Sequence, residues 1–166
     1  VVTDPDRRSR LAELYREGYL SMTGGMVAEA IGTDTDFGRL MSSTEWLVQH
    51  MGEVPVLVIP CYEPYMPRMD GDELFFPATL YGSIFPAVWS FQLALRSHGY
   101  GTCITTLHLR RSAEVAELLG IPDTHTQGCL LPVARLRAPD ELRPTPRKPL
   151  SEVSAIDDWD GPPLTV

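Results

Sequence analysis

The apolar residues of the chain recur at two spacings, which predict helices and strands that alternate along the sequence. Apolar positions three and four residues apart are typical of helices, and short unbroken apolar runs are typical of buried strands. Helices are expected at residues 4–20, 36–50, 83–98 and 112–119, and strands at 54–59, 102–107 and 128–136. Residues 21–35 are interrupted by glycines, so we expect a loop there with a short helical piece.

The ends of several segments carry residues suited to capping. Asp4 before Pro5 is a good helix start, because the carboxylate accepts hydrogen bonds from free backbone N–H groups and Pro is tolerated in the first turn. Gly99 is placed for a left-handed C-terminal cap. Ser112 is placed to cap the last helix, which Gly120 ends.

Two of the segments are expected to be deeply buried. The run at 54–59 predicts a central strand covered on both faces. The helix at 83–98 is apolar almost all round, which is typical of a largely buried helix. Residues 61–81 combine prolines, acidic residues and aromatic residues, so we expect a long loop that serves as a lid or an interface. The aromatic residues considered for this role are Tyr62, Tyr65, Phe75 and Phe76.

Charge and cysteine content narrow the function classes. The chain carries 22 acidic and 14 basic residues, a net charge of −8, which repels phosphate backbones and anionic membranes. No nucleic-acid or membrane partner is therefore expected. Cys61, Cys103 and Cys129 have no metal-ligand spacing, so no metal site is predicted. We expect Cys103 and Cys129 in the core as small apolar residues. Cysteines without a disulfide framework are typical of a reducing compartment, which favours a cytoplasmic location.

Motifs of common enzyme classes are missing from the sequence. It contains no GxSxG or HExxH pattern and no phosphate-binding glycine motif after a strand, which argues against hydrolases and dinucleotide folds. His108 could act as a general acid, but a lone histidine at a strand end is more often structural or exposed, and we favour that reading. Glu45 and His50, five residues apart on one helix, do not face each other.

A more specific signal comes from the block at residues 82–107, where an apolar helix, a Gly-Tyr-Gly turn and a β-favouring run follow one another. This block resembles the nitroreductase family. The resemblance continues in order at residues 1–5, 54–61, 118–122, 130–134 and 147–153. It implies an α+β fold, nitroreductase-like, with a central, mostly antiparallel sheet flanked by helices, in an intertwined homodimer.

The resemblance also implies an activity and a set of site residues. Such a protein holds FMN at the subunit interface and passes electrons from NAD(P)H to a small acceptor of nitroaromatic or quinone type. By the matching positions, Ile104, Thr105 and Thr106 approach the flavin ring, with Thr106 the strongest candidate, and Arg147 reaches the FMN phosphate. Without the block, the two threonines would be ordinary strand residues and Arg147 part of a solvated tail. No proton donor stands out, so no catalytic side chain is predicted.

The predicted organisation is one domain over residues 1–166, without the N-terminal part of the family domain and its arginine-rich stretch. Residues 138–166 are rich in Pro and charge, and we expect an extension that docks on the partner subunit, favoured by Trp159. Two alternatives stay open: a flavin-free interaction module of the same fold, and a reductive dehalogenase-like member of the superfamily. The acceptor and the choice of NADH or NADPH are not specified by these residues.

Overall fold

The computed structural model describes residues 1–22, 25–64, 73–138 and 147–165, and it divides the chain into two compact units, residues 1–136 and 137–166. The helices of the first unit are α1 (Pro5–Leu20), α2 (Gly25–Ala30), α3 (Asp36–His50), α4 (Phe75–Ser97) and α5 (Ser112–Leu119), with the 3-10 helices η1 (Met51–Glu53) and η2 (Leu107–Arg111). Its strands are β1 (Val56–Val58), β2 (Cys61–Tyr62), β3 (Tyr100–Thr102), β4 (Thr126–Gln127) and β5 (Leu131–Arg135).

The strands pair in antiparallel fashion. A three-stranded sheet has the order β1-β5-β3, and β2 pairs with β4 in a second, two-stranded sheet. Val2 adds a bridge to Leu57 on the outer side of β1, through hydrogen bonds of 2.7 and 3.0 Å. The predicted α+β class with an antiparallel sheet flanked by helices is confirmed.

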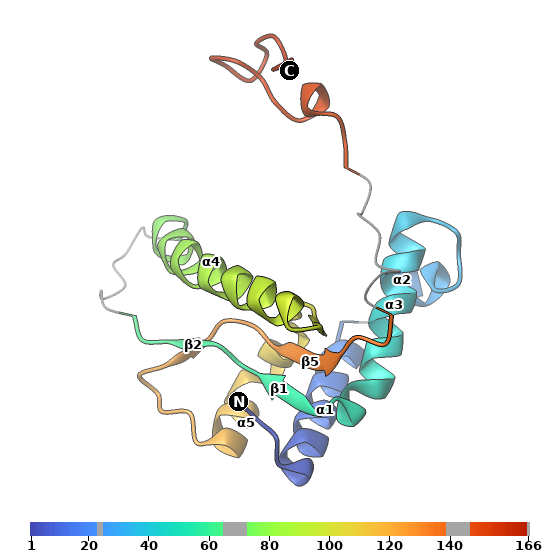
Figure 1. Cartoon of the computed structure of the whole chain (residues 1–166), viewed down its shortest axis with the longest axis vertical. Coiled ribbons are helices and arrows are strands. Elements are labelled where there is room, and N and C mark those ends of the chain that lie inside the picture. Colours follow the sequence, from blue (N-terminus) through green and yellow to red (C-terminus); the bar gives the residue numbers. More distant parts are fainter. Residues whose placement is uncertain (23–24, 65–72, 139–146, 166) are drawn as a thin grey trace. The chain divides into compact units, whose positions relative to one another are not determined.

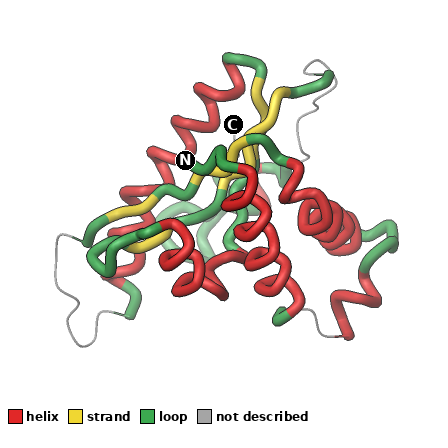
Figure 2. Tube along the Cα trace, turned by 90° about the horizontal axis from the view of Figure 1, so that it is seen from below, coloured by secondary structure: helices red, strands yellow, loops and turns green. Residues whose placement is uncertain are grey.

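Helices cover both faces of the three-stranded sheet. Figure 1 shows α4 on one side of β1 and β5, and α1 and α5 on the other. In Figure 2 the strands (yellow) lie among helices (red). On the α4 side, Val88 packs with Leu131 and Cys129. On the other side, residues of α1, including Leu11, pack with Leu57. Because side chains alternate across a strand, one short sheet serves two cores.

The first helix begins as the sequence indicates. The Asp4 carboxylate accepts a hydrogen bond of 2.9 Å from the N–H of Arg7, and Pro5 occupies the first turn. The buried stripe of α1 consists of Leu11, Leu14, Tyr15, Gly18 and Tyr19. From Leu11 to Tyr19 this helix therefore turns one face into the core.

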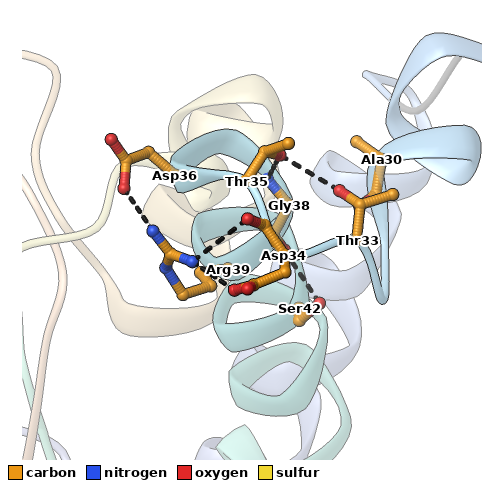
Figure 3. A network of polar contacts seen from close by, with 8 residues as sticks. All are labelled: Ala30, Thr33, Asp34, Thr35, Asp36, Gly38, Arg39 and Ser42. Carbon is orange, nitrogen blue, oxygen red and sulfur yellow. Dashed lines mark hydrogen bonds and ion pairs between the residues drawn. The ribbon is translucent and has the colours of Figure 1, made fainter.

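The start of α3 is fixed by a surface network of polar contacts, shown in Figure 3. Thr35 caps the helix, its hydroxyl accepting from the Gly38 N–H at 2.9 Å. Arg39 bridges back to Asp34 and to Asp36, the latter at 2.6 Å. These ion pairs are solvent-exposed, so each contributes only a few tenths of a kcal/mol, roughly. The network sets where α3 begins rather than how stable the unit is.

The predicted strands at 54–59 and 102–107 are longer than the observed ones. β1 spans only Val56–Val58, and of its residues only Leu57 is buried. It was expected to be central, but β5 holds that place. β3 spans Tyr100–Thr102, earlier than predicted, and η2 replaces the end of the predicted strand. An isolated bridge adds to the pairing near each short strand: Val2 pairs with Leu57 of β1, and Thr105 pairs with Leu130 beyond the end of β3.

Pro132 explains why β3 ends where it does. Alternate residues of β5 turn their N–H and C=O groups toward β3, as Leu130 does in its bridge to Thr105. Continuing that register places Pro132 opposite Cys103, and proline has no N–H to donate. The ladder is therefore interrupted after Thr102 and resumes only at the Thr105–Leu130 bridge.

The helix α4 differs from the sequence prediction at its start and in its burial. It begins at Phe75, so Phe75 and Phe76 are helical and not part of a loop, while Tyr65 lies outside the described residues. The prediction of a largely buried helix is wrong for the single chain, because only Val88 is buried. Its C-terminal end is as predicted, with Gly99 at φ 79°.

Two smaller predictions are also corrected. Ser112 is the first residue of α5 and makes no capping hydrogen bond, because Arg111 holds the cap position. Gly120 ends that helix in the left-handed conformation, as expected. Cys129 is buried, and burial raises the pKa of its thiol to about 11, but Cys103 is exposed and not a core residue.

The second unit is a small turn-rich segment. Its 3-10 helix η4 covers Leu150–Glu152. The Ser154 hydroxyl donates to Leu150 C=O at 2.7 Å and accepts from the Leu164 N–H at 3.1 Å, which closes the segment on itself. Trp159 is 95% exposed in this unit. The docking of residues 138–166 on a partner stays a prediction.

Candidate cofactor-binding segment

The predicted flavin-facing residues lie directly after the point where β3 leaves the sheet. Thr105 is held by its backbone: its N–H donates to Leu130 C=O at 3.0 Å, and its C=O accepts from the Leu130 N–H at 2.8 Å. Leu130 is fully buried. The middle of the segment Ile104–Thr106 is thus fixed to the central strand region.

The Thr105 side chain points into the core on the α1 side of the sheet. Its hydroxyl shares a hydrogen bond of 2.7 Å with the hydroxyl of Tyr15, a fully buried residue of α1. Burial raises the pKa of the Tyr15 phenol, so this group is neutral at physiological pH. With its backbone and hydroxyl both engaged, Thr105 has little capacity left for further hydrogen bonds.

Its two neighbours are exposed and keep free donors. Ile104 is 42% exposed, and Thr106 is exposed as well. Within the described part of the chain, neither the N–H of Ile104 nor the hydroxyl of Thr106 has a hydrogen-bond partner. An apolar side chain flanked by an N–H and a hydroxyl is suited to the edge and face of a flat, hydrogen-bond-accepting ring.

A close helix contact fixes the chain just beyond this segment. A Cβ atom on Gly18 of α1 would overlap the Leu107 carbonyl oxygen, so only glycine allows this approach. His108 follows and is 0% exposed, with no hydrogen-bond partner for either ring nitrogen in the described residues. Burial lowers its pKa to about 4, so the ring is neutral at pH 7. His108 is therefore buried and not exposed, in keeping with the structural role favoured from the sequence.

We expect Gly18→Ala to destabilise the protein by about 2 kcal/mol, because the added methyl group must push Leu107 away from α1. Urea denaturation measures the change. Gly52→Ala is the control, since a Cβ there would lie 3.6 Å from the Ala12 Cβ, an ordinary contact. Equal midpoints for the two variants would contradict the close packing of α1 on Leu107.

Arg147 belongs to the unit 137–166, whereas Ile104, Thr105 and Thr106 belong to the unit 1–136. Each unit is described by itself, so the role of Arg147 at the FMN phosphate stays a prediction. Sequence reasoning missed the hydrogen bond between Tyr15 and Thr105, because a tyrosine in the apolar stripe of a helix looks like any core residue.

The surface cavities described in the first unit have other linings. One of about 340 Å³ is lined by Val2, Arg7 and Cys61, among others, and one of about 500 Å³ by Phe91 and Tyr100, among others. None of these cavities is lined by Ile104, Thr105 or Thr106, and Ile104 and Thr106 are exposed in the single chain. In the described residues, no group of three or more His, Cys, Asp and Glu side chains could hold a metal ion, and no helix is long and apolar enough to cross a membrane.

Fold and segment together define a helix-flanked antiparallel α+β protein with a donor-bearing loop at the end of β3. Residues 1–135 match the nitroreductase family, and the chain belongs to that family. No curated protein sequence matches it.

Solved structures with the same fold are distant in sequence. A structure of oxidized iodotyrosine deiodinase bound to FMN and 3-iodo-L-tyrosine is 20% identical, with 89% of this chain and 70% of that chain covered and a TM-score of 0.58. The FMN and NADPH-dependent nitroreductase NfnB from Sphigopyxis sp. strain HMH is 17% identical, with 96% and 78% covered and a TM-score of 0.60. A BluB-like flavoprotein from Clostridium difficile 630 is 19% identical, with 95% and 77% covered and a TM-score of 0.56.

Proposed function

We propose that the protein is an FMN-dependent oxidoreductase that passes electrons from NAD(P)H to a small nitroaromatic or quinone-type acceptor. The observation that carries this proposal is the exposed segment Ile104–Thr106, with its free N–H and hydroxyl donors, in a chain of the nitroreductase family. The edge of a flavin ring offers nitrogen and carbonyl acceptors for such donors. The residues present fit this group.

Each site residue then has a distinct task. Ile104 and Thr106 contact the ring, and the Thr106 hydroxyl donates to a ring acceptor. Thr105 holds the segment from behind through Leu130 and Tyr15. Arg147 pairs with the phosphate, for which a forked guanidinium is suited. FMN supplies the redox chemistry when bound, and the chain contributes positioning and electrostatics.

The protein works as a homodimer in this proposal, with α4 in the interface. Several large apolar side chains on and just before α4 are exposed in the single chain: Leu74, Phe75, Tyr81, Trp89, Phe91 and Leu93. Exposed apolar surface of this extent is typical of a protein interface. A second copy that covers α4 also encloses the open segment Ile104–Thr106. The cytoplasmic location remains a prediction.

The test is an FMN titration of the purified 166-residue protein, followed by gel filtration to remove free flavin. We expect a retained visible flavin band at one FMN per chain, because the exposed donors of Ile104 and Thr106 make no hydrogen bond within the described part of the chain and are available to the flavin ring. A Thr106→Val variant should bind about 3- to 10-fold more weakly, the effect of one lost hydrogen bond. A protein that stays colourless at saturating FMN would favour the flavin-free interaction module.

The acceptor class is tested separately with the FMN-loaded protein. We expect turnover of nitroaromatic or quinone acceptors with NADH or NADPH, measured by oxidation of the nicotinamide. A halogenated phenol is the comparison substrate, since a reductive dehalogenase-like activity is the other candidate within the superfamily. Turnover of the halogenated phenol alone would replace the proposed acceptor class.

A further inference from the structure

Thr105 is fixed by three hydrogen bonds although it lies outside the regular strands. Its N–H and C=O pair with Leu130, and its hydroxyl pairs with Tyr15 at 2.7 Å. Leu130 and Tyr15 are both fully buried. The backbone pair anchors the segment to the sheet, while the hydroxyl pair sets the direction in which the side chain points.

On either side of Thr105 the backbone is held less tightly: Ile104 has no ladder partner among the described residues, and Thr106 is held through its C=O, which accepts from the Leu109 N–H at 2.9 Å. The missing N–H of Pro132 interrupts the ladder between Thr102 and Thr105, and η2 begins at Leu107. In extended backbone, consecutive side chains point to opposite sides. Turning Thr105 inward toward α1 therefore turns Ile104 and Thr106 outward, to where both are exposed.

We propose that Tyr15 is a positioning residue of the flavin site: by holding the Thr105 hydroxyl inward, it presents the donors of Ile104 and Thr106 to FMN. This inference rests on the proposed FMN binding. Tyr15 lies on α1 behind the segment and acts through Thr105, without contact to the cofactor.

Double-mutant analysis of FMN binding tests the proposal. Tyr15→Phe and Thr105→Val each remove one hydroxyl at nearly constant volume, so each should weaken FMN binding about 3- to 10-fold. The double variant should be no weaker than either single one, because both remove the same hydrogen bond. Thr105→Ser keeps the hydroxyl and should restore binding. The flavin midpoint potential should shift in Tyr15→Phe and Thr105→Val by the same amount.

Tyr19→Phe is the matched control. Tyr19 is a buried residue of the same helix, and its hydroxyl has no hydrogen-bond partner among the described residues. We expect this variant to keep the affinity and the midpoint potential of the unaltered protein. Equal losses in Tyr19→Phe and Tyr15→Phe, or strictly additive losses in the double variant, would overturn the positioning role.

Hydrogen exchange of the flavin-free protein gives a readout that does not need the cofactor. In Tyr15→Phe the Thr105 amide should exchange faster, while the Leu57 amide, which pairs with Val2, should not change. Unchanged exchange at Thr105 would overturn the inference. If the unaltered protein fails to bind FMN, the proposed function fails, and the exchange measurement still decides whether Tyr15 orders the segment.

Discussion

A variant with Trp89→Glu and Leu93→Glu should be monomeric and should leave gel filtration without FMN, whereas the unaltered protein should be a yellow dimer. These side chains lie one helical turn apart on α4 and are 60% and 54% exposed in the single chain. Each contributes about 2 kcal/mol when fully buried, and a two-fold interface counts both residues twice, so the dimer loses about 8 kcal/mol. That is roughly a millionfold weaker association.

Sedimentation velocity over a range of protein concentrations measures the association. Leu40→Glu is the control, because Leu40 is 58% exposed but lies on α3, away from the proposed interface. It should leave the dimer and the flavin band unchanged. A Trp89→Glu, Leu93→Glu variant that stays dimeric would exclude this face of α4 as the interface, and a monomer that keeps FMN would separate dimerisation from cofactor binding.

The second large effect is a loss of stability in acid that originates at His108. Its pKa is lowered by burial from 6.5 to about 4 in the folded chain and returns to about 6.5 on unfolding. The unfolded chain therefore takes up the proton first, so this contribution to stability is complete above pH 6.5 and is lost as the pH falls toward 4. The loss amounts to about 3 kcal/mol, since each pKa unit corresponds to 1.36 kcal/mol.

A His108→Leu variant should abolish this part of the pH dependence. Leucine cannot be protonated and leaves no buried nitrogen without a partner, so the variant should equal or exceed the stability of the unaltered protein at pH 7. Urea denaturation at intervals from pH 7 to pH 4 provides the comparison. The exposed His98, changed to Gln, is the control and should leave the acid limb as it is. If the free energy of unfolding of His108→Leu fell as steeply between pH 7 and pH 4 as that of the unaltered protein, other groups would be the cause.

Most helix boundaries, with the exception of the start of α4, could be predicted from the sequence because they depend on nearby residues. Asp4 and Thr35 cap α1 and α3 through hydrogen bonds to groups three residues away, and Gly99 supplies the left-handed turn that ends α4. Such contacts are local, and the residue types that make them are few.

The ends of the strands could not be predicted, since they depend on residues far along the chain. The run 102–107 favours strand structure by composition, but Pro132 interrupts its partner and ends β3 at Thr102. The prediction that α4 is largely buried was wrong for a similar reason. An apolar helix surface indicates that something covers it, but the pattern does not specify whether the cover belongs to the same chain.

The candidate site was predicted only through its resemblance to a family. The β-favouring run around Thr105 and Thr106 has no special feature by itself, and Tyr15 looks like a core residue of an amphipathic helix. The role proposed for Tyr15 depends on one hydrogen bond to Thr105, a contact that a single sequence does not reveal.

That hydrogen bond also bears on the order of folding. It joins residues 90 positions apart, and closing so large a loop costs entropy that only the later packing of α1 against the sheet offsets. Thr105 further needs Leu130, so a growing chain on the ribosome cannot complete the segment until synthesis has passed that residue. The proposed cofactor-binding segment is therefore expected to assemble late, and flavin uptake would report the completion of folding rather than initiate it.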